Sequence, residues 1–204
     1  MAHAVPAAPQ FGDALPVRAS PEILAFLARR RSASAMTLRA PAPSEAELHD
    51  LLTLAARAPD HGKLAPWRFV VLRDEGKAAF VGDLEAIAAA REDAAKALAK
   101  LGKIRVPPLT VAVISRYVEG DIPEWEQRLS AGAVCTILTI AAQAMGYGAN
   151  WITDWYAYDE AVGMLLKLAP GEKVAGFVHL GTTAEDPLER VRPDVAAITT
   201  DWPG

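Results

Sequence analysis

A long apolar segment in the second half of the chain constrains the fold most. Pro123-Glu124-Trp125-Glu126 has the proline and the acidic residues of a helix start. Apolar residues then recur at helical spacing up to Met145 and occur nearly all round the predicted helix. Such a helix must be buried in the middle of the protein or in a dimer interface. A chain of 204 residues is long enough to bury it within one ordinary domain.

The remaining pattern predicts several shorter elements. Ser20-Pro21-Glu22 begins a helix that runs out at Arg29–Ser32, and Ser44-x-x-Glu47 is a capping box for a helix that reaches Arg57. We expect further helices over 75–102, broken near Ala90 or Gly102, and over 159–168, and strands over 67–73, 109–114, 150–153 and 174–180. Because Val70, Val71 and Leu72 are apolar in succession, the first strand is predicted to be covered on both faces.

Composition excludes several classes of protein. The formal charge of −4 argues against nucleic acid as a partner, and no run of about 18 apolar residues predicts a membrane span. Residues 1–19 are predicted to form a flexible arm rather than a signal peptide, because prolines interrupt their apolar residues. An alternative is that this arm embraces a second subunit. Residues 20–204 would form the single domain, and we expect a cytoplasmic location.

Reactive side chains are few. The chain has no internal disulfide, because Cys135 is its single cysteine, and we interpret that residue as a core residue rather than a nucleophile. His3, His49 and His179 are too scattered to predict a metal site; we expect His49 at a helix surface and His179 partly buried with its polar atoms satisfied. The motifs of serine hydrolases, P-loop enzymes, dithiol enzymes and zinc proteases are absent.

The loop over residues 57–68 is the strongest candidate for a binding site. Arg57, His61 and Lys63 place three nitrogen donors within seven residues, beside Gly62, which lets backbone approach a ligand closely. This composition suits an anionic or heteroaromatic ligand. The alternative is an ordinary exposed connection between a helix and a strand.

Three segments together resemble the nitroreductase superfamily, in particular its small branch of NAD(P)H nitroreductases. Ala-Pro-Asp-His-Gly-Lys-Leu-Ala-Pro-Trp-Arg-Phe at 58–69 is similar to the signature loop of that branch. Arg29-Arg30-Arg31-Ser32 resembles the family's Arg-Arg-Ser motif, and Gly146-Tyr147-Gly148-Ala149-Asn150-Trp151 resembles its Gly-aromatic-Gly-x-x-Trp segment. The three occur in family order across roughly residues 20–183.

The resemblance implies an α+β, three-layer fold in which helices wrap a central, mostly antiparallel sheet. It implies a homodimer that holds FMN in its interface and passes two electrons from NAD(P)H to a nitroaromatic, quinone or similar acceptor by a ping-pong mechanism. No residue of the chain need be catalytic in the usual sense, since the flavin carries the redox chemistry. The residues implied to bind FMN or to shape the nicotinamide face are Arg30, Arg31, Ser32, Gly146, Gly148, Trp151, Ile152 and Thr153, with Arg57 and His61 reaching FMN from the neighbouring subunit.

Several alternative interpretations of these residues and of the function remain. A basic triplet at the end of a helix is favoured by the helix dipole alone, so Arg29–Arg31 need not bind phosphate. Arg190 and Arg192 are further candidates for a phosphate contact or for exposed surface residues. Ile152 replaces a more usual arginine, which predicts weaker contacts to FMN or to the nicotinamide phosphates. Dehalogenation, flavin cleavage, a non-enzymatic flavin carrier and a plain helical interaction domain are the alternative functions.

Overall fold

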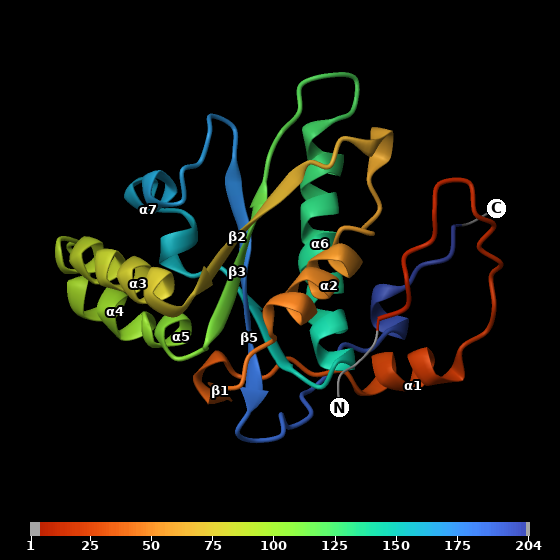
Figure 1. Ribbon diagram of the computed structural model, residues 1–204, viewed down its shortest axis with the longest axis horizontal. Coiled ribbons are helices and arrows are strands. Elements are labelled where there is room, and N and C mark those ends of the chain that lie inside the picture. Colours follow the sequence, from red (N-terminus) through yellow and green to blue (C-terminus); the bar gives the residue numbers. More distant parts are fainter. Residues whose placement is uncertain (1–4, 203–204) are drawn as a thin grey trace.

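The computed structural model describes residues 5–202 and has three layers (Figure 1). The strands are β1 (Leu38–Arg39), β2 (Trp67–Arg73), β3 (Leu109–Ser115), β4 (Gly148–Ile152) and β5 (Lys173–Thr183). They form one sheet in the order β1-β5-β3-β2, and β4 also pairs with β5. Every pairing is antiparallel, which confirms the predicted α+β class with its antiparallel sheet.

Helices cover both faces of this sheet. They are α1 (Pro21–Arg29), α2 (Glu45–Ala55), α3 (Asp74–Ala89), α4 (Ala94–Lys100), α5 (Gly102–Arg105), α6 (Glu124–Ala144) and α7 (Glu160–Leu165). Figure 1 shows α2 and α6 on one side of the sheet and α3, α4, α5 and α7 on the other. Each side has its own buried apolar cluster, so the sheet separates two hydrophobic cores.

The local signals explain where most helices begin and end. The Ser20 hydroxyl accepts a hydrogen bond from the Ile23 amide, and Ser44 and Glu47 form the predicted capping box. Gly146 lies just past α6 with φ +83°, the left-handed conformation of a helix terminator. The break near Ala90 is also present, between α3 and α4.

Two of the sequence predictions fail in this part of the molecule. Among the described strands β2 pairs with β3 alone, so it lies at an edge of the sheet. Val71 is 37% exposed, so the prediction of cover on both faces is wrong for the single chain. The helix predicted over 159–168 ends at Leu165, because Lys167 adopts φ +52° before the turn at Gly171.

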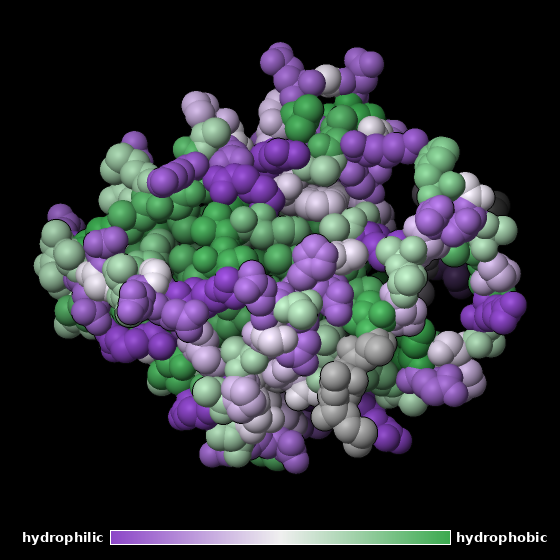
Figure 2. Space-filling view, viewed as in Figure 1, coloured by the Kyte–Doolittle hydropathy of each residue, from purple (hydrophilic) through white to green (hydrophobic). Residues whose placement is uncertain are grey.

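The amino-terminal segment packs little against the domain. Helix α1 has no buried residue, and its apolar side chains Ile23, Leu24 and Leu27 are exposed. Residues 5–19 form neither helix nor strand, and Figure 2 shows open space between this arm and the body. His3 and the rest of residues 1–4 of the predicted arm lie outside the described residues, as do residues 203–204.

Candidate cofactor site

The segment after α1 is fixed against the free edge of β4. Arg30 caps α1 in an extended conformation, and its Nη1 donates to the Ser32 hydroxyl over 3.5 Å. The Ala33 amide donates to the Ala149 carbonyl over 3.1 Å, and the Asn150 side chain donates to the Ala33 carbonyl. Arg30 and Ser32 are therefore held beside β4 by the two contacts of the neighbouring Ala33 backbone.

A pocket of 240 Å³ forms where this turn meets α6. Its lining, which we call the Arg30 pocket, consists of Arg30, Ser32, Thr136, Thr139, Ile140 and Trp151. A guanidinium and three hydroxyl groups thus surround one small hollow. The Thr136 and Thr139 hydroxyls already donate to the Gly132 and Cys135 carbonyls of α6. The donors that suit a phosphate group are therefore the Ser32 hydroxyl and the Arg30 guanidinium, which can bind phosphate oxygens with two parallel hydrogen bonds.

Arg31 points away from this pocket. Its Nε donates to the Leu188 carbonyl over 2.8 Å and lies 3.8 Å from the Glu189 carboxylate. Arg192, from the same carboxyl-terminal arm, donates to the Arg30 carbonyl over 3.3 Å. Arg31 therefore contacts the carboxyl-terminal arm and not the Arg30 pocket. Arg192 of that arm contacts the backbone of Arg30.

The two glycines named by the motif lie on the far side of Arg30. They line a wider groove of 760 Å³ together with Arg31 and Tyr147. A side chain at Gly148 would overlap Thr183 and Leu38, so close packing explains this glycine. Gly146 is explained by its positive φ at the end of α6. Neither glycine therefore needs a ligand contact to explain its presence.

Trp151, Ile152 and Thr153 continue the free edge of β4. Trp151 lies opposite Val178 of β5, and its indole Nε1 donates to the Ala175 carbonyl over 3.3 Å. The carbonyl of Ala149 already points outward to Ala33, and backbone groups alternate in direction along an antiparallel strand. The backbone groups of Trp151 therefore also face the open edge, where a ligand in the neighbouring pocket can reach them.

Beyond Thr153, a cluster appears that the sequence reasoning missed. Asp154 has φ +60° and ψ −179°, a conformation that is essentially restricted to glycine. Only 3% of its side chain is exposed, and it accepts from Lys103 over 3.0 Å and lies 3.2 Å from Lys100. Burial alone would raise the pKa of Asp154, but hydrogen bonds from Lys103, the Trp155 amide and Lys100 hold it below its usual value.

This cluster places two ammonium groups at the end of the 151–153 segment. Backbone strain of this kind gathers at ligand sites, where surrounding contacts maintain it. In the sequence, Lys100 and Lys103 belong to an exposed-looking helical stretch some 50 residues away from Asp154, so spacing gave no signal. The hint in the sequence was the acidic residue that directly follows Thr153.

The signature loop lies at the other end of α6. His61 Nδ1 lies 2.7 Å from Glu126 Oε2, and Asp60 holds the loop by accepting from the Leu64 and Ala65 amides. Glu126 and Thr139 are 13 positions apart on α6, which is about 20 Å along the helix axis. A single chain thus keeps His61 far from the Arg30 pocket, and the exposed Arg57 does not line that pocket either.

Other titratable residues lie outside this region. Cys135 is fully buried, and burial raises the pKa of its thiol to about 12, in agreement with a core residue. His49 is exposed, as predicted. His179 is fully rather than partly buried, and it shares a hydrogen bond with Thr110. Its Nε2 has no partner among residues 5–202, so the prediction of a satisfied side chain is wrong.

Residues 5–202 offer neither a metal-binding cluster nor a membrane-spanning helix. No group of three or more histidine, cysteine or acidic residues there is arranged to hold a metal ion. Within the same range, no helix is both long and apolar enough to span a membrane.

The chain is similar to known proteins over most of its length. A candidate NAD(P)H nitroreductase of Escherichia coli (strain K12), YdjA, is 36% identical over 164 residues, which cover 79% of this chain and 88% of that protein. The structure of a nitroreductase-like family protein from Bacillus cereus superposes with a TM-score of 0.79 at 22% identity, covering 94% of this chain and 100% of that one.

A second structure carries a ligand. A candidate nitroreductase from Desulfovibrio desulfuricans, solved in complex with FMN, has a TM-score of 0.70 at 21% identity and covers 91% of this chain and 99% of its own. These likenesses confirm the expected nitroreductase-like fold. The sequence model described as "Nitroreductase family" matches residues 27–182. The chain therefore belongs to the nitroreductase family of oxidoreductases.

Proposed function

We propose that this protein is an FMN-dependent oxidoreductase. It takes two electrons from NAD(P)H and delivers them to a nitroaromatic, quinone or similar small acceptor by a ping-pong mechanism. Family membership and the names of the relatives support the reaction class. The FMN bound to the Desulfovibrio desulfuricans relative supports the cofactor.

The Arg30 pocket is the single observation that carries the proposal. Its guanidinium and the Ser32 hydroxyl fit a cofactor phosphate, and the open backbone edge at Trp151 lies beside them. Arg30 and Ser32 would hold the phosphate, and residues 151–153 would lie along the rest of the cofactor. When bound, FMN supplies the redox chemistry. The chain supplies binding and orientation, and the cluster of Lys100, Lys103 and Asp154 leaves one positive charge in excess beside the same segment.

We further infer that two copies of the chain complete each site. Helix α6 keeps an exposed, largely apolar stripe in which Trp125 is 68% and Leu129 55% exposed. A twofold axis near Gly132, the middle of this stripe, would set Glu126 of one copy opposite Thr139 of the other. His61, held by Glu126, would then reach the Arg30 pocket of its neighbour.

The ends of the chain fit the same arrangement. The exposed apolar residues of α1 and of the carboxyl-terminal arm lack cover within one chain, and a second copy would supply it. In this proposal residues 20–204 form the FMN-binding domain and residues 1–19 form an arm. The cytoplasmic location stays a prediction.

An absorption spectrum of the purified protein tests the cofactor. We expect flavin bands that survive dialysis at about one FMN per chain after reconstitution, and we expect NAD(P)H to bleach them. Addition of a quinone should restore the bands, and steady-state oxidation of NAD(P)H would separate an enzyme from a flavin carrier. Colourless protein that cannot be reconstituted with FMN would contradict the proposal.

A further inference from the structure

Trp151 occupies a slot between two glycines. Its indole lies between α6 and β5, where Nε1 donates to the Ala175 carbonyl. A side-chain carbon at Gly176 would overlap the indole nitrogen, whereas one at Gly132 would meet the far edge of the ring at 3.9 Å, an ordinary contact. The position of the indole therefore requires glycine at 176 and tolerates alanine at 132.

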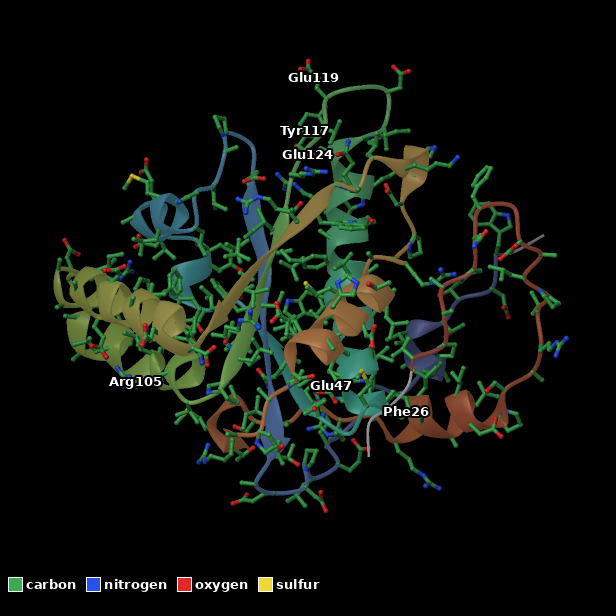
Figure 3. All side chains as sticks on the ribbon, in the orientation of Figure 1. Phe26, Glu47, Arg105, Tyr117, Glu119 and Glu124 are labelled. Carbon is green, nitrogen blue, oxygen red and sulfur yellow. The ribbon has the colours of Figure 1, made fainter. Side chains whose placement is uncertain are left out.

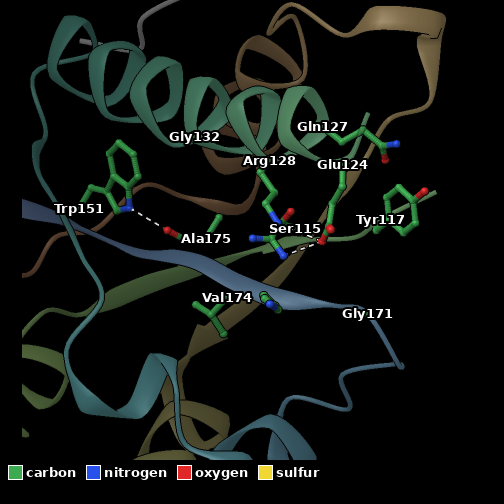
Figure 4. Close-up of a pocket in the computed structure, with 11 residues that line it drawn as sticks. Ser115, Tyr117, Glu124, Gln127, Arg128, Gly132, Trp151, Gly171, Val174 and Ala175 are labelled. Atoms are coloured by element: carbon green, nitrogen blue, oxygen red, sulfur yellow. Dashed lines mark hydrogen bonds and ion pairs between the residues drawn. The ribbon is translucent and has the colours of Figure 1, made fainter. Parts of the chain in front are cut away.

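The indole separates two hollows. On one side lies the Arg30 pocket, and on the other lies a pocket of 290 Å³ that we call the Trp151 pocket. Figure 4 shows Trp151 at one end of this second pocket and Tyr117 at the other. Figure 3 places Tyr117 near the loop between β3 and α6, at the rim of the molecule. Two aromatic rings thus bound a small hollow that opens at the surface.

The walls between these rings are small or charged. Glu124, Arg128 and Gly132 recur every fourth residue on α6 and so line one face of the helix. Arg128 is neutralised by Glu124, whose carboxylate accepts from the guanidinium Nε over 3.0 Å. Lys173, opposite them on β5, has neither an ion pair nor a side-chain hydrogen bond within the described part of the chain. The pocket therefore carries one positive charge in excess.

The size of the pocket limits its ligand. Pockets for small molecules usually start near 300 Å³, so this one suits a single ring better than a fused system. Aromatic rings at both ends favour a planar ligand, and the free ammonium favours an anionic one. The Trp151 indole closes the end nearest the Arg30 pocket, so this ring sets the length available.

We propose that the Trp151 pocket binds a one-ring aromatic anion as the electron acceptor, and that Trp151 and Lys173 determine its size and charge. This inference rests on the proposed function, because it places the acceptor beside the segment assigned to the cofactor. It extends that function by naming the chemical class of the substrate.

The charge is tested by binding, which needs no turnover. Calorimetry on the purified protein would compare 4-nitrobenzoate with nitrobenzene, its uncharged counterpart. We expect Lys173→Gln to weaken 4-nitrobenzoate about fivefold and to leave nitrobenzene within twofold. Lys96→Gln, at an exposed lysine outside the pocket, is the matched control. Equal effects on both ligands, or no measurable binding of 4-nitrobenzoate to the unmodified protein, would overturn the inference.

The size limit is tested by displacing the indole. Gly176→Ala should push Trp151 out of its slot, and Gly132→Ala, the same change on the other side of the ring, should leave it in place. We expect Gly176→Ala to raise the ratio of the affinity for anthraquinone-2-sulfonate to the affinity for 4-nitrobenzoate about tenfold. The smaller ligand loses its aromatic contact with Trp151, and the larger ligand gains room for one more contact. If Gly176→Ala does not fold, Trp151→Ala replaces it in the test, and the same rise in the affinity ratio is expected. An unchanged ratio in Trp151→Ala would overturn the inference.

The two proposals fail separately. A protein that binds 4-nitrobenzoate with the predicted dependence on Lys173 but transfers no electrons would contradict the proposed function and the acceptor role, and would leave the ligand class of the pocket standing. A flavin enzyme whose ratio of kcat/KM for the two acceptors does not respond to Trp151→Ala would contradict only this inference.

Discussion

The two faces of the sheet differ in how completely the chain covers them. On the face covered by α3, α4, α5 and α7, Tyr156 and Phe177 are fully buried with their rings 5.0 Å apart. On the face covered by α2 and α6, Trp125, Leu129 and Trp151 stay exposed, and the two proposed ligand pockets lie there. The first face is closed by the chain at its centre, although Tyr158 and Met164 stay exposed at its margin. The second has the incomplete cover expected of a surface that takes a cofactor and a second copy.

The largest effect is expected on the closed face. Phe177→Ala should lower the free energy of unfolding by about 3–5 kcal/mol, because it leaves a cavity beside Tyr156. Urea unfolding would measure the loss, and the FMN content of the folded fraction should not change. A loss below about 1 kcal/mol would mean that this core is less tightly packed than the buried areas indicate.

On the open face, a change should affect the ligand rather than the fold. Arg30→Ala removes a charged donor from the proposed phosphate site, and such a hydrogen bond contributes about 1.5–3 kcal/mol. We expect FMN to bind about tenfold to a hundredfold more weakly, measured by flavin fluorescence on titration, with unfolding unchanged. Arg29→Ala, one residue earlier, is the control and should retain FMN. Equal losses in both variants would show that general positive charge, not Arg30, holds the phosphate.

The closed face should also make stability depend on pH. Burial, together with the nearby charge of Lys77, lowers the pKa of His179 to about 3 from its ordinary value of 6.5. Between these values the unfolded chain binds a proton that the folded chain does not, so stability falls as pH falls below 6.5, by about 1.4 kcal/mol per pH unit.

His179→Gln tests this dependence. The variant has no group that titrates at this position, so its free energy of unfolding should fall less steeply between pH 6.5 and pH 5 than that of the parent. The comparison of slopes is independent of any constant loss caused by the substitution. Identical slopes would mean that His179 is protonated in the folded state.

The smallest effect on ligand affinity is expected at Ile152, which stands where the family pattern usually has an arginine. Ile152→Arg restores a cation beside the proposed cofactor segment and should tighten FMN or the nicotinamide nucleotide by about threefold, the scale of a partly exposed ion pair. Ile152→Met is the uncharged control. If Ile152→Arg leaves both affinities unchanged, the missing arginine does not weaken these contacts.

Sequence reasoning reached the elements that local chemistry determines. The capping box at Ser44, the helix stop at Gly146 and the strand over 67–73 depend on neighbouring residues, and all three are present. It failed where the outcome depends on distant packing. β1 has two residues and exists because it pairs with the end of β5, and the edge position of β2 follows from the strand order.

The same limit applied to the site. Arg30, Ser32 and Trp151 carried a motif and do meet in one pocket. The Asp154 cluster depends on Lys100 and Lys103, which a separate helical segment brings in, and no sequence spacing relates them. The turning of Arg31 toward the carboxyl-terminal arm was likewise beyond prediction, because adjacent arginines are equivalent by composition.

A mixed dimer tests most directly whether the open face completes its sites with a second copy. One chain would carry Arg30→Ala and the other Arg57→Ala with His61→Ala, and the two would be co-expressed with different affinity tags. If each site uses Arg30 of one copy and the loop of the other, one site of the mixed dimer is intact, and about half an FMN per chain should be retained while both parent variants lose it. A mixed dimer that retains no more FMN than its parents would contradict the shared site.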